Sequence, residues 1–396
     1  MPSALHRHWT LDPGVTFLNH GSFGAAPRPV LEFQQSLRDE MEREPVQFLW
    51  RRLPARLDAA RAALATFLGA PPEGLAFVPN ATSAVSAVLR SVELEPGDEL
   101  LTTDHAYNAC RNALDEAAHR AGATVAVARV PFPIHSADEA LAAILDAVTP
   151  RTRLALVDHV TSPTALVLPV GRIVRELEER GVDTLVDGAH APGMLELDLA
   201  GLRPAWYTGN LHKWVCAPKG AAFLWAREDR REVLRPPVIS HGWNTPRPGS
   251  SRYHDLFDWT GTFDPTAWLA VPEAIRFLGS LHPEGWAGVR RENRRLLLEA
   301  RELLVDALAL DAPCPPGLLG AMATLPLPGP FHHQPHASPD PLQLALHDRH
   351  RIEVPLLGFG GRRWFRISAH LHNAIGDYRR LAESLADPAS GFDPPA

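Results

Sequence analysis

The pattern of hydrophobic and polar positions divides the chain into stretches of different character. Residues 31–68 have helical periodicity, with Leu53, Leu57 and Leu64 on one face. From about residue 75, short apolar runs alternate with helical stretches; the runs lie at 75–78, 99–103, 124–128, 153–157 and 184–186. Strands that alternate with helices of ten or more residues are typical of βαβ units and a mostly parallel sheet.

After about residue 260 the pattern changes. Two long helical stretches (265–281 and 286–308) precede a Pro-rich segment, a predicted helix (341–350) and strand-like runs at 352–356 and 364–368. We therefore predict an α/β protein with a large domain over 16–260 and a smaller α+β domain over 261–396 together with 1–15. A chain of 396 residues is long enough for two domains. In such a sheet, catalytic groups gather in the loops at the carboxyl ends of the strands.

Composition and charge exclude several classes of protein. With 45% hydrophobic and 21% charged residues, the chain is typical of a globular protein with a large core. A net charge of −7 gives no reason to expect nucleic acid or an anionic membrane surface as a partner. The 3 cysteines form no CxxC pattern, which fits a reducing compartment. Because we find neither a signal peptide nor an apolar run long enough to span a membrane, we expect a cytoplasmic protein.

Lysine is the first candidate for chemistry. Lys213 and Lys219 are the only lysines, so nearly all the basic side chains are Arg. Lys213 follows His212 and precedes Trp214, in a loop after a strand-like run. An amine forms an imine with an aldehyde and a guanidinium does not, so this position suits imine chemistry. The alternative is that Lys213 is an ordinary surface lysine without a role in chemistry.

A second candidate lies where the run at 184–186 ends, at Asp187. A carboxylate at this edge of a parallel sheet can keep a pyridine nitrogen protonated, which makes the ring an electron sink. His190, three residues later, can reach the phenolic oxygen of the same ring. The alternative is a helix-capping Asp, which the following Gly-Ala-His-Ala-Pro-Gly disfavours as a helix start.

Three further segments carry weaker signals. Ala81 and Thr82 lie between a strand and a helix, where backbone amides and hydroxyls bind phosphate, although such residues are also ordinary helix caps. His105 or Tyr107 is placed to stack on a planar cofactor. Arg366 lies in an apolar strand, where it either pairs with a substrate carboxylate or forms an internal salt bridge. We expect no metal site: His332, His333 and His336 lie in a Pro-rich loop without acidic or Cys partners at ligand spacing.

Taken together and in this order, these motifs resemble class V aminotransferases, which bind pyridoxal phosphate (PLP), along nearly the whole chain. The resemblance rests on the Asn-Ala-Thr-Ser turn at 80–83, the strand ending Asp-x-x-His at 187–190, His212-Lys213, and Phe-Arg-Ile-Ser at 365–368. Segments 18–24, 159–163, 209–214 and 259–262 look like the isopenicillin N epimerase branch. The implied fold is the PLP-dependent transferase fold type I.

The resemblance also implies roles for individual residues. Lys213 would hold PLP as a Schiff base and act as acid and base at the substrate α-carbon; Asp187 would bind the pyridine nitrogen and His190 the ring hydroxyl. His105 would stack on the ring, with Tyr107 as the alternative. The phosphate would be held by Ala81, Thr82 and His212, helped by Thr262 of a second subunit. Arg366 would take the substrate carboxylate, with Asn19 and His20 at its entrance. A site shared between subunits implies a homodimer.

The reaction itself stays open at this stage. The same residues serve epimerisation, β-elimination and transamination, because all three begin by weakening the bonds at the α-carbon. We favour an epimerase acting on a small amino-acid-like substrate. The alternative is a lyase that cleaves a C–S bond, or less readily an aminotransferase. A cysteine desulfurase is disfavoured, since no Cys follows Cys314. A binding module without catalysis has no use for an imine-forming lysine.

Overall fold

A seven-stranded sheet forms the centre of the larger part of the molecule. The structure, a computed structural model, describes residues 3–329, 332 and 336–386, so His333 lies outside the described residues. The strand order is β2-β8-β7-β6-β5-β3-β4. The strands are β2 (Leu75–Val78), β3 (Glu99–Thr103), β4 (Thr124–Ala128), β5 (Thr152–Asp158), β6 (Asp183–Asp187), β7 (Trp206–Asn210) and β8 (Ala222–Ala226). Neighbours run parallel except at β8, which is antiparallel to both β2 and β7. The predicted mostly parallel sheet is confirmed.

The strands and helices form for local reasons. Every residue of β2, β3, β7 and β8 is buried, as expected for strands covered on both faces. Helices on the sheet are amphipathic; α7, for example, buries Val170, Ile173, Val174 and Leu177 at helical spacing. The helices of this layer are α4 (Ala81–Ser91), α5 (Asn108–Ala121), α6 (Ala137–Asp146), α7 (Val170–Glu179) and α8 (Leu199–Leu202). The sequence pattern had not indicated β8, which follows directly after the Lys213 loop.

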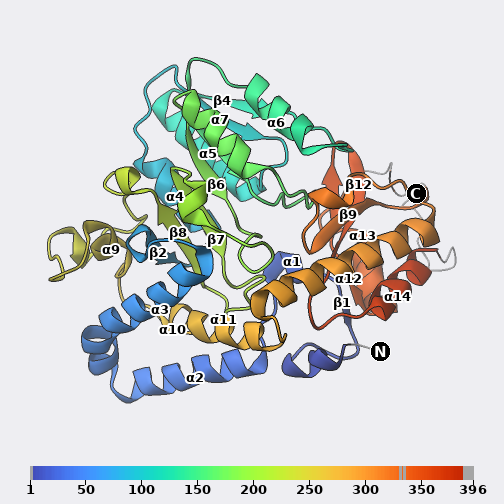
Figure 1. Ribbon diagram of the computed structural model, residues 1–396, viewed down its shortest axis with the longest axis horizontal. Coiled ribbons are helices and arrows are strands. Elements are labelled where there is room, and N and C mark those ends of the chain that lie inside the picture. Colours follow the sequence, from blue (N-terminus) through green and yellow to red (C-terminus); the bar gives the residue numbers. More distant parts are fainter. Residues whose placement is uncertain (1–2, 330–331, 333–335, 387–396) are drawn as a thin grey trace.

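The predicted helical stretch at 31–68 is divided into three. It forms α2 (Arg28–Arg43), a turn of wider helix (Gln47–Arg52) and α3 (Leu53–Leu68). Later helices α10 (Thr266–Leu269) and α11 (Val271–Ser280) pack against α2 and α3, although they lie within the predicted small domain. Figure 1 shows these four helices together beneath the sheet. The domain boundary at 260 remains a prediction.

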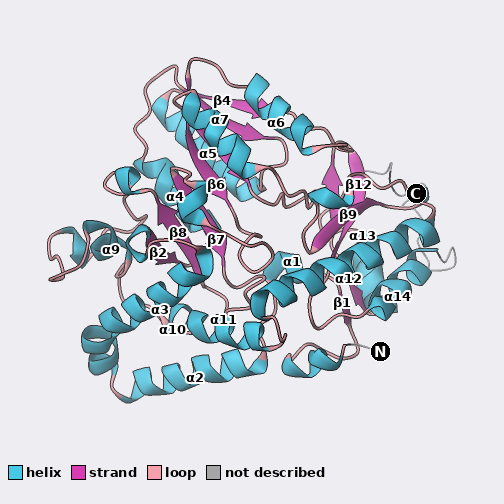
Figure 2. Ribbon diagram, in the orientation of Figure 1, coloured by secondary structure: helices cyan, strands magenta, loops and turns pink. Residues whose placement is uncertain are grey.

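The smaller part combines the C-terminal segment with the start of the chain. A three-stranded antiparallel sheet has the order β11-β12-β9, and β1 pairs in parallel with β10 (Figure 2). Its elements are β1 (Thr16–Phe17), α12 (Gly285–Leu308), β9 (Met322–Pro326), α13 (Pro341–His350), β10 (Ile352–Glu353), β11 (Leu356–Phe359), β12 (Arg362–Ser368) and α14 (Ile375–Ala386). Strand β9 lies within the segment predicted only as Pro-rich. The short helix α1 (His20–Phe23) lies between the two parts.

The remaining elements are short. They are the single-turn helices Ala4–His8, Pro72–Gly74, Glu228–Arg230, His241–Trp243 and Pro316–Leu318, together with α9 (Arg252–Phe257). Among the described residues, no helix is long and apolar enough to cross a membrane.

Candidate active site

A cavity of about 360 Å³ opens at the carboxyl ends of β5, β6 and β7. This is where an open α/β sheet binds its ligands, and the volume suits a small molecule. The lining residues come from α1, the start of α4 and the loops after β3, β5, β6 and β7: Ser22, Phe23, Pro79, Asn80, Ala81, Thr82, Tyr107, Asp158, Ser162, Asp187, Ala189, His190, Asn210, His212, Lys213, Lys219 and Gly220.

The Lys213 backbone is held between two close-packed glycines. Gly24 has φ of +66°, and a side chain there would collide with the His212 carbonyl oxygen. Gly193 has φ of +85°, and a side chain there would collide with the Trp214 backbone. Only glycine combines these φ values with such contacts at no steric cost. The turn carrying Lys213 is therefore fixed from both sides.

The Lys213 amine faces the cavity beside a buried imidazole. Its Nζ lies 3.1 Å from His190 Nε2. The loss of water around this amine, together with the nearby Arg366 guanidinium, lowers its pKa to about 7. Trp214 Nε1 donates a hydrogen bond of 3.4 Å to His190 Nδ1, which leaves the imidazole proton on Nε2. An amine with this pKa is substantially neutral near pH 7, as nucleophilic attack on an aldehyde requires.

Asp187 ends β6 next to a second carboxyl group. One of its oxygens accepts a hydrogen bond from the Ala189 amide (2.9 Å) and the other from the Cys110 thiol (3.2 Å). Asp158 is its register partner on β5 and also lines the cavity. Burial and the neighbouring Asp187 raise the pKa of the Asp158 carboxyl well above its usual range, so this group stays protonated. Asp187 therefore lies beside a carboxyl group that is held in its neutral form.

The opposite end of the cavity favours an anion. Asn80 caps helix α4, and its side chain accepts from the Ser83 amide. Because the Ala81 amide is also paired, the Thr82 amide is the first-turn donor left for an anion among the described residues. Asn210 Oδ1 accepts from the Ala81 amide at 2.9 Å. His212 and Lys219 complete this end. Because His212 Nδ1 faces the Ala221 carbonyl oxygen at 3.1 Å, its Nε2 is left for a ligand.

Arg366 is buried without a carboxylate partner among the described residues. It is 3% exposed. Its guanidinium donates to the Ser162 carbonyl oxygen (2.5 Å) and to the Ser22 hydroxyl (3.2 Å), and its Nε has no partner in the part of the chain that the structure describes. Burial lowers its pKa to about 10, which leaves it charged at neutral pH. A buried charge without a counter-ion lowers the stability of the folded protein, so Arg366 is suited to bind an anionic ligand. The alternative of an internal salt bridge is not observed.

The structure reverses the order of preference between His105 and Tyr107. His105 is fully buried, and its ring nitrogens lie 2.6 Å from Thr164 Oγ1 and 3.0 Å from the Val130 carbonyl oxygen. It does not belong to the cavity lining, whereas Tyr107 does and is 47% exposed. The expected stacking by His105 is therefore wrong for this structure, because its ring faces into the protein.

Two other expected contacts with the substrate entrance are also corrected. Asn19 is buried; its side-chain nitrogen donates to Glu353 (2.9 Å), and its Oδ1 accepts from the Ser22 hydroxyl. His20 is fully buried behind the Lys213 turn. Neither lines the cavity; their neighbour Ser22 does. Thr262 is exposed and outside the lining of this single chain, so its contact with a second subunit stays a prediction.

Sequence reasoning missed several residues of the site. Asp158 ends its strand as Asp187 does, so the same argument could have found it. Cys110, Ser22 and Ser162 act through contacts with Asp187 or Arg366 from distant parts of the chain, and no local pattern marks them.

Comparison with known proteins decides the family. Residues 34–304 match the model of "Aminotransferase class-V". This chain belongs to the class V aminotransferase family. It is 41% identical to isopenicillin N epimerase of Amycolatopsis lactamdurans, over 96% of each chain. It is 37% identical to isopenicillin N epimerase of Streptomyces clavuligerus, over 95% of each chain. It is also 31% identical to a putative L-cysteine desulfhydrase of Oryza sativa subsp. japonica, over 94% of this chain and 83% of that protein.

Solved structures agree on the fold. The cystine C–S lyase C-DES, in complex with its reaction product cysteine persulfide, matches with a TM-score of 0.80 at 20% identity, over 95% of this chain and 98% of that chain. A C-DES variant with glycine covalently linked to its PLP cofactor matches equally well (0.80, 21% identity, 97% and 99% coverage). The predicted PLP-dependent fold type I is confirmed, and the family uses PLP. The cavity fits that cofactor, since it offers an imine-forming amine, a carboxylate and an anion-binding end.

Proposed function

We propose that this PLP-dependent enzyme is an epimerase that removes the α-proton of an amino acid or amino-acid-containing substrate and returns it to the opposite face. The observation that carries the proposal is the Lys213 amine, which faces the cavity with a pKa near 7, between Asp187 and Arg366. A proton-transfer group works best when its pKa lies near the operating pH. When bound, PLP supplies an aldehyde that condenses with amines and a ring that stores the electrons freed at the α-carbon.

Several lining residues, and Arg366 beside them, have roles in this proposal. Lys213 Nζ holds the cofactor and moves the proton; the Asp187 carboxylate faces the pyridine nitrogen. His190 Nε2 binds the ring hydroxyl, and Tyr107 takes the stacking position. The anion end, formed by Ala81, Thr82 and His212, binds the phosphate. Arg366 binds the substrate carboxylate between Ser22 and Ser162, so that the α-carbon is oriented toward Lys213.

A C–S β-lyase is the second candidate, because relatives named L-cysteine desulfhydrase match over most of the chain, for example at 31% identity. The two candidates differ in the fate of the α-carbon. An epimerase returns a proton and keeps the side chain, whereas a β-lyase expels the β-substituent after the same proton is removed.

We also propose a homodimer in which Thr262 of the partner subunit completes the phosphate site. Exposed apolar side chains near this segment support it: Val238 (52% exposed), Ile239 (53%) and Trp243 (47%). A cytoplasmic location is likewise proposed, supported by three buried cysteines that form no disulfide.

Two measurements test the function. The purified enzyme is incubated in deuterated water with isopenicillin N or with L-cysteine, and products are identified by NMR and chiral chromatography. We expect α-deuterated, inverted product from an amino-acid centre without pyruvate. Release of pyruvate and ammonia with no inverted product would overturn the epimerase in favour of the lyase.

The site of cofactor attachment is tested separately. Borohydride reduction of the PLP-loaded protein followed by peptide mass spectrometry should find the pyridoxyl group on Lys213. Because the chain has only two lysines, Lys219 is a built-in control and should stay unmodified. Modification of Lys219 instead, or of neither lysine, would contradict the assignment, and the variant Lys213→Ala should lose the visible absorbance of bound cofactor.

A further inference from the structure

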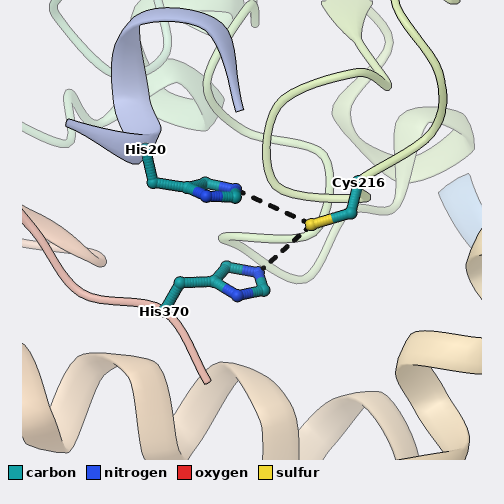
Figure 3. A group of neighbouring side chains, drawn as sticks. All are labelled: His20, Cys216 and His370. Carbon is teal, nitrogen blue, oxygen red and sulfur yellow. Dashed lines mark hydrogen bonds between the residues drawn. The ribbon is translucent and has the colours of Figure 1, made fainter. Parts of the chain in front are cut away.

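A second group of buried side chains lies on the far side of the Lys213 turn. His20 from α1, Cys216 from the turn after Lys213, and His370 after β12 place one donor atom each within 4.8 Å of one another. Cys216 Sγ lies 3.7 Å from His20 Nε2 and 3.5 Å from His370 Nε2. Figure 3 shows both imidazoles directed toward the sulfur. His372 adjoins them, with its Nε2 3.2 Å from His20 Nδ1. We call these four residues the histidine cluster.

We propose that His20, Cys216 and His370 form a binding site for a thiophilic d¹⁰ cation, Zn²⁺ or Cu⁺. A thiolate and two imidazoles are ligands that such ions prefer. Metal–sulfur bonds of about 2.3 Å and metal–nitrogen bonds of about 2.0–2.1 Å at a tetrahedral angle separate sulfur from nitrogen by about 3.6 Å. Both observed sulfur–nitrogen distances, 3.7 and 3.5 Å, match this separation.

The protonation states of the ligands suit a cation. Burial and the neighbouring histidines hold the pKa of His20 well below its usual range, and burial lowers that of His370 to about 3. Both imidazoles are therefore neutral. His20 Nε2 now donates to the Lys213 carbonyl oxygen, so its proton must move to Nδ1, which faces His372 Nε2, before Nε2 can bind a metal. Burial raises the pKa of the Cys216 thiol, so binding must release this one proton to solvent as the metal–sulfur bond forms. No Asp or Glu belongs to the described cluster. With Cu⁺ the metal–thiolate pair is neutral; with Zn²⁺ it carries one positive charge.

Neighbouring groups complete the coordination environment. The Lys213 carbonyl oxygen lies 3.1 Å from His20 Nε2 and is placed to become a fourth ligand. His372 hydrogen-bonds the other ring nitrogen of His20, which is how a ligating imidazole is usually oriented. The Cys216 backbone has φ of +56°, in the left-handed region that residues other than glycine seldom adopt. Such strain tends to be kept where the side chain has a function.

A route for the ion leads from the surface. A cavity of about 220 Å³ is lined by His6, His372 and Asp377, among others. His372 thus has one side in this cavity and the other against His20. The Trp9 ring packs edge-on against His370 and His372, so an ion passes from the cavity by way of His372 when Trp9 moves aside.

Binding requires one rearrangement. The His20 and His370 rings are stacked, with planes 19° apart and centroids separated by 4.2 Å. Lone pairs lie in the ring planes, so the two rings must tilt toward each other to meet at one ion. This movement draws His20 Nε2 away from its present position beside the Lys213 carbonyl oxygen. Metal binding therefore acts directly on the turn that carries the proposed cofactor lysine.

The test uses the PLP-loaded enzyme stripped of metal by a chelator. Samples receive either Zn²⁺ or, without oxygen and with a reductant, Cu⁺; excess ion is removed by gel filtration. We expect about one ion per chain by elemental analysis, with X-ray absorption showing one sulfur neighbour at about 2.3 Å. The variant Cys216→Ser should lose both signals. Cys314→Ser is the matched control, because Cys314 is also a buried free thiol but lies outside the cluster.

A graded variant separates a ligand from its support. His372→Asn should weaken metal binding by about 10- to 100-fold while retaining the sulfur neighbour, as loss of an orienting partner does. If Cys216→Ser does not fold, His370→Ala replaces it and should remove one nitrogen neighbour and most of the bound ion. The proposal is overturned if neither ion is retained, or if Cys216→Ser or His370→Ala retains as much metal as the wild type with unchanged spectra. These readouts do not depend on the reaction catalysed.

Discussion

The turn from Lys213 to Cys216 separates two buried polar clusters of opposite chemistry. On one side lies the cavity cluster, consisting of Lys213, Asp187, His190 and Arg366. The first three line the cavity, and Arg366 adjoins the lining through Ser22 and Ser162 and has no carboxylate partner among the described residues. On the other side, the histidine cluster is closely packed and holds neutral imidazoles and a thiol. The first has N–H donors and basic groups to offer to anions. The second has lone pairs to offer to a cation.

This difference shows that burial of polar side chains does not by itself identify a ligand-binding site. Both clusters contain fully buried histidines with lowered pKa values. Only the cavity cluster combines charge with room for a ligand, so it marks the place where a phosphate and a carboxylate bind. The histidine cluster can support the Lys213 turn through hydrogen bonds, or it can bind a metal ion. Adding a metal ion to the protein is the way to distinguish these two roles.

The largest effect is expected when the unpaired charge of the cavity cluster is removed. Arg366→Ala should weaken substrate binding by roughly 2–5 kcal/mol, because the substrate carboxylate would lose its buried partner. At 1.4 kcal/mol per factor of ten, this is about a 30- to 4,000-fold loss in affinity. Arg362→Ala on the same strand removes the same charge from an exposed position and serves as control. Equal effects of the two variants on KM would show that Arg366 does not meet the substrate.

The sequence predicts most of the cavity cluster but not the histidine cluster. Lys213, Asp187 and His190 were found because each lies just after a recognisable strand, where an α/β fold collects its ligands. The sheet, most helices and the anion end followed from the same alternation of apolar runs. His20, Cys216 and His370 come from three segments separated by over 150 residues, so only the tertiary structure brings them together.

The direction in which a side chain points could also not be predicted from the sequence. His105 and Tyr107 are two residues apart after β3, and no sequence pattern decides which of the two rings faces the cavity. The structure turns His105 inward because Thr164 and the Val130 carbonyl satisfy its nitrogens. Strand β8, with its short buried run, also escaped notice because it follows the Lys213 loop without an intervening helix.

A second prediction concerns pH and tests whether the cavity cluster holds the Lys213 amine in its neutral form near pH 7. In cofactor-free protein, the fraction of neutral Lys213 amine should rise about tenfold per pH unit below its pKa of about 7 and level off above it. The rate of PLP binding, followed by visible absorbance, should therefore increase roughly fiftyfold from pH 5 to pH 7. An exposed lysine with the usual pKa near 10.4 would show a rate still rising at pH 9, and that result would contradict the lowered pKa.

The smallest effect is expected in the metal-free histidine cluster. His20→Phe keeps a ring of similar size but removes the contacts with the Lys213 carbonyl and with His372. Leaving such buried groups unpaired should lower the free energy of unfolding by about 1–3 kcal/mol. His119→Phe, at an exposed position late in α5, should change it by no more than about 0.5 kcal/mol. Urea unfolding monitored by tryptophan fluorescence gives both values. If His20→Phe were as stable as the wild type, the hydrogen bonds behind the Lys213 turn would contribute little, and the cluster would differ from the cavity only in its packing.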